Sequence, residues 1–462
     1  MTADKVCILG AGSSGIAAAK LLQEHRVPYD CFEKGSGIGG NWRYQNDNGM
    51  SAAYASLHIN TSKTRMAYSD FPMPEDYPDY PHHRQILEYF EGYVDHFGIR
   101  PQIRFHTSVE SLEPDDGGWR VTVSGADSGS RRYAAVLVCN GHHWDAKLPD
   151  FPGSFAGRTL HAHDYRTPEG MEDKNVLVVG IGNSGVDIAC ESSRVSARTF
   201  LSTRRSAHVV PKYVWGKPID QLTSPAGSLL PLAVQNFFLT TVLRLARGPQ
   251  TAFGLPDPEH RLLQAHPTVS ADLLNLIGRG RIAVKPDVDR LDGGTVRFAD
   301  GSEEKIDVVV YATGYKVRFP FLAPELVDSA ANEIRLYRYV VHPTLPGLYF
   351  IGLVQPLGAV MPLAEAQSEW VAKLLTGECA LPDRDAMEAA YEKDRAAMRR
   401  RYVRSTRHTL QVDFFPYMKQ IKKEIRRGRK LARRKPAAKS AIPNPSPQPS
   451  PATGEGATAL PR

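Results

Sequence analysis

The same spacing of glycines occurs twice in this chain, and it constrains the fold more than any other feature. Gly10-Ala11-Gly12-Ser13-Ser14-Gly15 lies near the N-terminus, and Gly180-Ile181-Gly182-Asn183-Ser184-Gly185 lies deep in the chain. A G-x-G-x-x-G sequence between a strand and a helix is the fingerprint of a dinucleotide-binding βαβ unit. Two copies predict two such units, and 462 residues are enough for two or three domains.

The first copy has the flanking sequence that the fingerprint requires. Val6–Leu9 is a short apolar run typical of a buried parallel strand, and residues 16–22 are strongly helix-forming. The glycines would form a tight turn and admit a pyrophosphate to the helix N-terminus. A second predicted strand, Tyr29–Phe32, ends at Glu33. In such units an acid roughly 20 residues after the glycines binds the ribose hydroxyls, and Glu33 stands close to that place.

The second copy has the same beginning and a different end. Asn175–Val179 is the predicted strand before the glycines, and residues 186–190 continue as a helix. The next predicted strand, residues 199–202, ends in Thr203-Arg204-Arg205 rather than in an acid. A guanidinium can bind a 2′-phosphate bidentately, whereas a carboxylate would repel it. We therefore expect NADP here rather than NAD or FAD; the alternative is that both arginines belong to a solvated strand end.

Several classes of protein are disfavoured by the cysteines and the apolar segments. The five cysteines are widely scattered and none has CxxC spacing, which argues against a disulfide framework, a metal site and a redox-active dithiol. From the cysteine spacing we expect no metal site. We expect a cytoplasmic protein, since scattered cysteines suit a reducing compartment and no signal peptide precedes the first strand. The stretch 229–245 is broken by polar residues and falls short of a membrane span. It belongs to a longer apolar segment, from after Arg205 to about Leu263, that we expect to pack in the core; a wall of the substrate pocket or a membrane surface are the alternatives.

The net charge of +7 is concentrated at the C-terminal end. Residues 422–462 hold eleven basic and two acidic side chains, whereas the rest of the chain holds 46 and 48. Because the end is also rich in proline and serine, we expect residues 421–462 to form a disordered basic tail. Such a tail could touch an anionic membrane or a nucleic acid, but it is more often only solvated, and we expect no nucleic-acid partner.

The segment before the second fingerprint carries a further motif. Phe155-Ala156-Gly157-Arg158-Thr159-Leu160-His161-Ala162-His163-Asp164-Tyr165 matches FxGxxxHxxxY. With a dinucleotide fingerprint on either side, the chain resembles the class B flavin-dependent monooxygenases, and among them the flavin-containing monooxygenases. The resemblance extends over about residues 5–420, and it is supported by Gly39-Gly40-Asn41-Trp42, residues 56–61, Asp70-Phe71-Pro72, Ala312-Thr313-Gly314-Tyr315, Gln355-Pro356-Leu357-Gly358 and Ala364-Glu365-Ala366-Gln367.

The resemblance implies a fold class and a division of the chain. The expected fold is α/β, with two Rossmann-like dinucleotide-binding domains and the smaller NADPH domain inserted into the larger FAD domain. Residues 1–165 and 300–420 would form the FAD domain, and residues 166–299 the NADPH domain. The expected partners are a small-molecule substrate and dioxygen, while a homodimer and contact of the basic tail with a membrane surface stay open.

The resemblance also implies roles for individual residues. Asn60 matches the family's active-site asparagine and is the expected catalytic residue, although an Asn before Thr61 could instead only form a turn. His161 and Tyr165 define the motif and are expected to be structural. The expected cofactor contacts are Gly10, Ala11, Gly12, Ser13, Ser14, Gly15, Glu33, Gly40, Asn41, Trp42, Ile59, Asn60, Thr61, Ser184, Gly185, Val186, Asp187, Thr203, Arg204, Thr313, Gly314 and Gln367.

The implied activity is oxygenation of a soft nucleophile, at the nitrogen of an amine or the sulfur of a sulfide, through a C4a-hydroperoxyflavin. The motif ends in Tyr165-Arg166, where Baeyer–Villiger enzymes of the same class favour Trp and then Pro or Asp, and this favours N- or S-oxygenation. Three alternatives remain: a Baeyer–Villiger or oxidative-decarboxylating activity, an uncoupled NADPH oxidase, and a polyanion-binding protein that uses its nucleotide folds as sensors.

Overall fold

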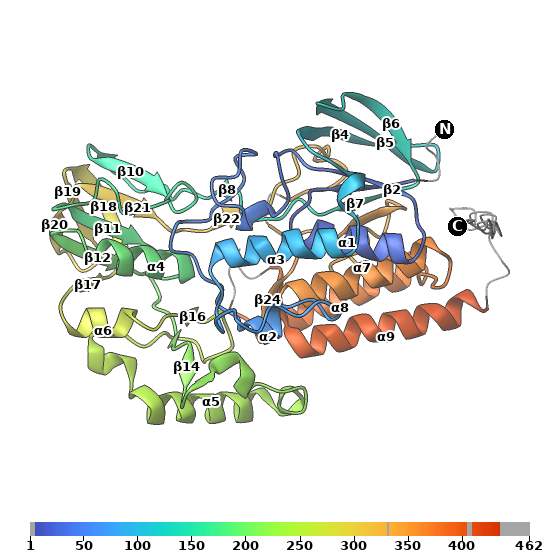
Figure 1. Cartoon of the computed structure of the whole chain (residues 1–462). Coiled ribbons are helices and arrows are strands. Elements are labelled where there is room, and N and C mark those ends of the chain that lie inside the picture. Colours follow the sequence, from blue (N-terminus) through green and yellow to red (C-terminus); the bar gives the residue numbers. More distant parts are fainter. Residues whose placement is uncertain (1–4, 330–331, 404–408, 435–462) are drawn as a thin grey trace, which may run out of the picture.

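Two five-stranded parallel sheets form the framework of the protein (Figure 1). The structure is a computed structural model, and it describes residues 5–329, 332–403 and 409–434. The first sheet has the order β23 (Leu348–Phe350), β7 (Ala135–Val138), β1 (Val6–Leu9), β2 (Tyr29–Phe32) and β3 (Ile103–Arg104). The first glycine sequence therefore connects a central strand, β1, to the helix α1 (Ser13–Glu24), as the fingerprint predicts.

The second sheet repeats this arrangement around the second glycine sequence. Its order is β10 (Arg158–His161), β21 (Val308–Tyr311), β11 (Asn175–Val179), β12 (Arg198–Ser202) and β17 (Ile282–Lys285), and β11 leads into α4 (Asn183–Ser192). All five strands lie between β7 and β23 in the chain, so the second sheet is inserted into the first. The predicted fold class, two Rossmann-like units with one inserted, is confirmed.

The sheet pairing differs from the domain boundaries expected after residues 165 and 299. β10 and β21 were expected in the first domain, but His161 pairs with Tyr311, and Tyr311 also pairs with Val179 of β11. The physical reason is that the valine run of β21 is apolar on both faces and needs a strand on each side, which β10 and β11 provide. The second unit therefore begins before β10 and ends after β21.

Alternate residues of the central strands face opposite sides of each sheet. Val6 and Ile8 of β1 pack among α1, α3 (His83–His96) and α7 (Met361–Leu375). Cys7 and Leu9 of the same strand point the other way, onto an antiparallel meander of β4 (Thr107–Asp115), β5 (Gly118–Gly125) and β6 (Gly129–Tyr133). Both faces are covered, which explains why the strands read as continuous apolar runs.

The second sheet is covered in the same way, by α4 and α6 (Leu273–Gly278) on one face and by small strands on the other. Two further helices are α2 (Lys63–Met66) and α8 (Arg384–Arg401). The remaining strands are β8 (Asp145–Ala146), β9 (Gly153–Phe155), β13 (Val209–Val210), β14 (Tyr213–Val214), β15 (Lys217–Pro218), β16 (Thr268–Val269), β18 (Val288–Gly293), β19 (Thr295–Phe298), β20 (Glu303–Lys305), β22 (Tyr315–Lys316), β24 (Gln355–Leu357) and β25 (Gln411–Asp413).

The expected tail of residues 421–462 begins as a packed helix, which corrects the prediction of disorder. α9 (Phe414–Ala432) lies beside α7 (Figure 1), and its buried residues Tyr417, Ile421, Glu424 and Gly428 recur at helical spacing. Gly428 approaches so closely that a Cβ there would lie 3.0 Å from Cys379 Cβ. The basic side chains hid this stripe in the sequence because they occupy the outer face; residues 435–462 lie outside the described residues.

Ile421→Ala should destabilise the protein by about 2–5 kcal/mol, because it removes a fully buried side chain and leaves a cavity between α9 and its neighbours. Chemical denaturation monitored by circular dichroism measures the change. Lys422→Ala is the matched control on the exposed side of the same helix, and its effect should stay within about 0.5 kcal/mol. Equal effects from the two variants would show that α9 does not contribute to the core.

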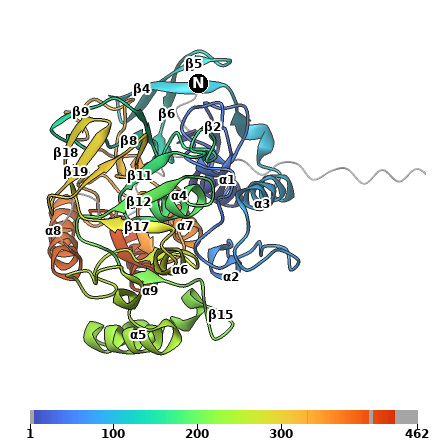
Figure 2. The same cartoon turned by 90° about the vertical axis from the view of Figure 1, so that its left-hand side faces the viewer.

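The expectation that the segment after Arg205 packs in the core holds only in part: Val210, Leu243 and Leu262 form a small core cluster, but most of the stretch 229–245 lies at the surface. This stretch folds largely into α5 (Leu232–Arg247), which lies at the lower margin of both views (Figures 1 and 2). Phe237 is 75% exposed and Leu245 74% exposed, while Val242 and Leu243 pack toward the protein. No helix in the described part of the chain is long and apolar enough to cross a membrane.

Candidate dinucleotide-binding site

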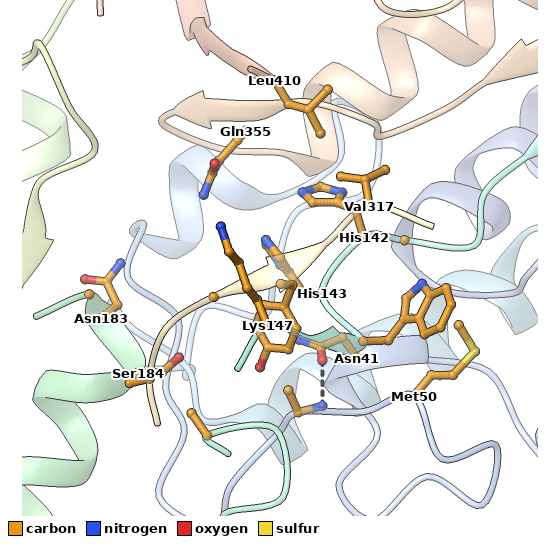
Figure 3. Close-up of a pocket in the computed structure, with 18 of the residues that line it drawn as sticks. Asn41, Met50, His142, His143, Lys147, Asn183, Ser184, Val317, Gln355 and Leu410 are labelled. Carbon is orange, nitrogen blue, oxygen red and sulfur yellow. Dashed lines mark hydrogen bonds between the residues drawn. The ribbon is translucent and has the colours of Figure 1, made fainter. Parts of the chain in front are cut away.

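Both glycine loops open into one cavity of about 1310 Å³. This volume exceeds the roughly 300–1,000 Å³ that is usual for a single small ligand. Figure 3 shows Asn183 and Ser184 of α4 on one side and Met50 on the other, with His143 and Lys147 between them. The cavity therefore joins the two nucleotide-binding units.

At position 15, where the helix first contacts the strand, the first loop can accept only glycine. A Cβ on Gly15 would lie 1.8 Å from the carbonyl oxygen of Gly10. Gly10 itself has φ +93°, a conformation that favours glycine. Gly12 is close to a second glycine segment, since a Cβ on Gly40 would lie 3.0 Å from its Cα. These contacts leave a narrow cradle of backbone that a pyrophosphate could approach.

Each glycine loop ends in an uncapped helix N-terminus. Gly12 is the N-cap of α1 and Gly182 the N-cap of α4, and neither helix has a side-chain cap. The first N–H groups of both helices are thus available to an anion, and the helix dipole favours negative charge there. The fit to the phosphates of two dinucleotides rests on these donors and on the absence of Cβ atoms around them.

Glu33, at the end of β2, is buried and bound to the first loop. Its Oε2 accepts a hydrogen bond from Ala11 N at 2.8 Å, and its Oε1 accepts from Gly35 N at 2.9 Å and from Asn48 Nδ2 at 3.0 Å. A carboxylate can accept about four hydrogen bonds, so one direction remains for a ribose hydroxyl. Sequence reasoning missed Asn48, which no local pattern connects to Glu33.

The end of β12 has a different electrostatic character. Arg204 and Arg205 follow Ser202 and Thr203 at the cavity wall, and both guanidinium groups are exposed. Within residues 5–329, 332–403 and 409–434, neither arginine forms an ion pair. Two cations at this point suit a phosphate on the ribose better than a free ribose hydroxyl.

The cavity brings most of the predicted contacts together, but not all of them. The predicted residues that line it are Gly10, Gly12, Ser13, Ser14, Glu33, Gly40, Asn41, Trp42, Ser184, Gly185, Thr203, Arg204, Thr313 and Gly314. The predicted residues that do not line it are Ala11, Gly15, Ile59, Asn60, Thr61, Val186, Asp187 and Gln367. Several of the second group support the wall from behind.

Gln367 and Asp187 are two such supports. Gln367 Oε1 accepts from Gly352 N at 2.8 Å and its Nε2 donates to Tyr417 Oη at 2.7 Å, so its amide holds the cavity-lining Gly352. Asp187 accepts a hydrogen bond from the Tyr54 hydroxyl, and burial raises the pKa of Asp187 to about 6. This hydrogen bond joins α4 to the loop that carries Tyr54.

The expected catalytic residue, Asn60, lies just outside the wall. Asn60 is half-buried, and the neighbouring Leu57 and Met66 line the cavity. The carbonyl of Ile59 accepts from Lys212 Nζ at 3.5 Å, and Ile59 N donates to Pro81 O at 3.1 Å. The main chain just before Asn60 is therefore held by two hydrogen bonds, both at Ile59.

Two adjacent histidines that no sequence motif indicates line the cavity. His142 and His143 follow the buried strand β7, where a plain loop is the ordinary interpretation, yet both line the cavity with Trp144. Burial lowers the pKa of His142 to about 4, so the ring is neutral. The buried His142 Nε2 and Trp144 Nε1 have no hydrogen-bond partner among the described residues. Their position at the carboxyl end of a central strand is the signal that could have found them.

The FxGxxxHxxxY segment forms part of the second unit. His161 ends β10, lines the cavity, and accepts from His163 N at its Nδ1 at 3.0 Å. Tyr165 is buried, and its hydroxyl donates to Glu191 Oε2 at 2.7 Å. No group of metal-binding side chains occurs in the described part of the chain.

Two nested Rossmann-like sheets that share one cavity define a class of enzymes that hold two dinucleotides together. Within this class the chain belongs to the flavin-binding monooxygenase-like family, which it matches over residues 3–433. It is accordingly a flavin-dependent monooxygenase whose cofactors are FAD and NADPH, and the predicted family is confirmed.

Curated relatives and solved structures agree with this membership. The chain is 40% identical to flavin-containing monooxygenase 5 of Oryctolagus cuniculus over 442 residues, which is 91% of this chain and 82% of that protein. It is 35% identical to dimethylaniline monooxygenase [N-oxide-forming] 2 of the same organism over 92% of this chain and 83% of that one. Its structure is similar to S-allyl-L-cysteine S-oxygenase from Allium sativum, with a TM-score of 0.70, 25% identity and coverage of 93% and 91%.

Proposed function

We propose that this protein uses NADPH and dioxygen to oxygenate the nitrogen or sulfur atom of small soft nucleophiles. The observation that carries the proposal is the single cavity that joins two uncapped helix N-termini, one beside a buried acid and the other beside two exposed arginines. This asymmetry supports FAD on the first loop and NADPH on the second, because Glu33 suits ribose hydroxyls and Arg204 suits a 2′-phosphate.

The proposed domains follow the sheets. The FAD domain consists of the first sheet with its meander and with α1, α3, α7 and α9, and the NADPH domain consists of the second sheet with its flanking elements. In the FAD domain, Ser13 and Ser14 would offer backbone N–H groups to the pyrophosphate, and Asn41 and Trp42 would lie along the flavin. In the NADPH domain, Ser184 and Gly185 would bind phosphate, with Val186 and Asp187 supporting that helix turn.

When bound and reduced, the flavin supplies the reaction with dioxygen that makes one oxygen atom transferable. The protein must hold both cofactors in register and keep water from the reacting atoms. The Tyr54–Asp187 hydrogen bond serves the first task, because it ties the NADPH helix to the FAD side of the cavity. The buried His142 Nε2 and the Trp144 Nε1–H are available to hydrogen-bond a bound cofactor or substrate.

Two relatives carry names that point to the type of acceptor atom. One is N-oxide-forming and another is an S-oxygenase. The motif ending Tyr165-Arg166, where Baeyer–Villiger enzymes favour Trp, supports the same chemistry here, and the Tyr165 hydroxyl binds Glu191 on α4, a carboxylate that also accepts from Ser56 Oγ at 3.2 Å. A Trp at this position would lose that hydroxyl.

The purified FAD protein, supplied with NADPH, should convert trimethylamine to its N-oxide and a dialkyl sulfide to its sulfoxide, with NADPH consumed in step with product. A cyclic ketone should be a poor substrate by comparison. Mass spectrometry of the products beside oxygen-electrode traces measures both. Lactone as the main product would favour the Baeyer–Villiger alternative, and peroxide without oxygenated product would favour the NADPH oxidase.

Asn60 is the proposed catalytic residue, with Ile59 and Thr61 as its neighbours at the flavin. Asn60→Ala should uncouple the reaction, so that NADPH is still consumed while product per NADPH falls about tenfold, the value of one hydrogen bond of roughly 1.4 kcal/mol. Peroxide yield and product yield, measured together, test this. Asn140→Ala, elsewhere on the wall, is the matched control, because the Asn140 side chain makes only a long hydrogen bond, from Nδ2 to Arg318 O at 3.3 Å. Unchanged coupling in Asn60→Ala would remove Asn60 from the mechanism.

A cytoplasmic location is proposed on the cysteines. All five are buried and unpaired, which suits a reducing compartment. A homodimer and membrane contact by the basic end stay predictions.

A further inference from the structure

The second nucleotide unit has a histidine near Arg205 that neither fingerprint indicates. His260 lies far beyond Arg205 in the chain, yet both line the same cavity together with Thr203, Arg204 and Ser206. The loop that carries His260 therefore folds back over the end of β12.

Hydrogen bonds fix this loop in place. Ser206 Oγ donates to Pro256 O at 2.5 Å, and the ring of His208 donates from Nε2 to the carbonyl of His260 at 2.7 Å. Gln250 Nε2 also donates to Pro256 O at 2.7 Å. Both ends of the segment 256–260 are thus anchored to the residues that immediately follow the arginines, so the position of His260 is determined by the fold.

The ring of His260 is held but its nitrogens are available. The rings of His208 and His260 meet edge to face, with centroids 5.3 Å apart. No hydrogen bond to either ring nitrogen of His260 is found among residues 5–329, 332–403 and 409–434. A fixed, partly exposed imidazole near Arg205, in the cavity wall that Arg204 also lines, can serve as a further donor for an anion at this point.

We propose that His260 is a third ligand of the 2′-phosphate of NADPH, and that it takes up a proton when this phosphate binds. The inference rests on the proposed binding of NADPH at the second loop. In this proposal two parts of the chain recognise the 2′-phosphate: the arginines that follow β12, and His260 from the loop 256–260.

The charges around His260 determine the direction of the proton transfer. Burial lowers the pKa of His260, and His208 and Arg205 lower it further, while Glu259 opposes them. Arg247 and Asp257 act on the neighbouring His208 with opposite signs. The ring is therefore neutral at neutral pH without ligand, and a phosphate carrying close to two negative charges favours its protonated form. Binding should strengthen as the pH falls, until the phosphate itself begins to protonate near about pH 6.

Binding of adenosine 2′,5′-bisphosphate and adenosine 5′-monophosphate to the FAD-loaded protein tests this. Isothermal titration calorimetry at about pH 6.5 and about pH 8.5, in two buffers that differ in ionisation enthalpy, gives the affinity and the protons taken up. His260→Gln should weaken the bisphosphate about 3- to 10-fold at the lower pH, leave the monophosphate unchanged, and reduce the proton uptake. His260→Arg, which keeps a charge at every pH, should retain the affinity and lose the pH dependence.

The controls separate the possible outcomes. His266→Gln changes another histidine of the cavity wall and should leave proton uptake as in the wild type. If the wild-type protein binds the two adenosine phosphates equally, the proposed 2′-phosphate site itself is wrong. If it prefers the bisphosphate but His260→Gln, with an unchanged melting temperature, has the same affinity and proton uptake, only the role of His260 is overturned.

Discussion

Replacing Arg204 by alanine is expected to abolish most of the preference for NADPH over NADH. The guanidinium is exposed at the cavity wall and has no ion pair among the described residues, so the substitution leaves no charge unpaired inside the protein. A hydrogen bond to a charged group is worth about 1.5–3 kcal/mol, which corresponds to roughly a 10- to 150-fold loss in kcat/KM for NADPH. The value for NADH, which lacks the 2′-phosphate, should change little.

Steady-state kinetics with both nucleotides measure this preference. Arg198→Ala is the matched control, because Arg198 begins β12, the strand that Arg204 follows, is also exposed, and pairs with Glu304 away from the cavity. It should leave the ratio of the two kcat/KM values unchanged. A ratio that survives Arg204→Ala would mean that the end of β12 does not bind the 2′-phosphate.

Gly15→Ala should produce a protein that is less stable and does not retain FAD. The added Cβ would lie 1.8 Å from the carbonyl oxygen of Gly10, so α1 must move away from β1. Overpacking costs about 1–3 kcal/mol when side chains can adjust, and a backbone oxygen adjusts less readily, so we expect about 3 kcal/mol. The same movement displaces the N–H groups that would face the pyrophosphate.

The flavin absorbance of the purified protein and its melting temperature test this prediction. Gly92→Ala is the matched control: Gly92 is also in a helix, and its Cβ would make only an ordinary contact of 3.8 Å with Phe71. That variant should bind FAD normally and be as stable as the wild type or up to about 1 kcal/mol more stable. Full flavin content in Gly15→Ala would contradict the proposed role of the first loop.

Features that depend on neighbouring residues were predictable from the sequence, and features that depend on distant ones were not. The strands Val6–Leu9 and Asn175–Val179 and the glycine turns after them are local patterns, and the structure has them at the predicted residues. The apolar run Val308–Tyr311 is typical of a buried strand, but its sequence does not tell which of the two sheets it joins. The contacts of Glu33 with Asn48 are likewise absent from any local pattern.

Composition was misleading at two helices. The charge of residues 421–434 concealed a buried stripe that begins at Tyr417, since the average over a segment does not register which face its basic side chains occupy. At α5 the opposite error occurred: apolar composition suggested burial, while Phe237 and Phe238 face outward. Neither local patterns nor composition indicate His260, because a loop brings it to the cavity wall near Arg205 from far along the chain.

The insertion of one sheet into the other also sets the order in which the two sheets can form during synthesis. β7 must wait for its neighbour β23, since Val136 pairs with Leu348, which is synthesised only after the whole inserted sheet. The inserted sheet closes earlier, when β21 pairs with β10 and β11. The first sheet, whose strand β1 is synthesised first, is thus the last to be completed. Until α7 is synthesised, the apolar face of α1 that packs against it stays uncovered. Nascent chains halted before residue 348 should expose this face to chaperones.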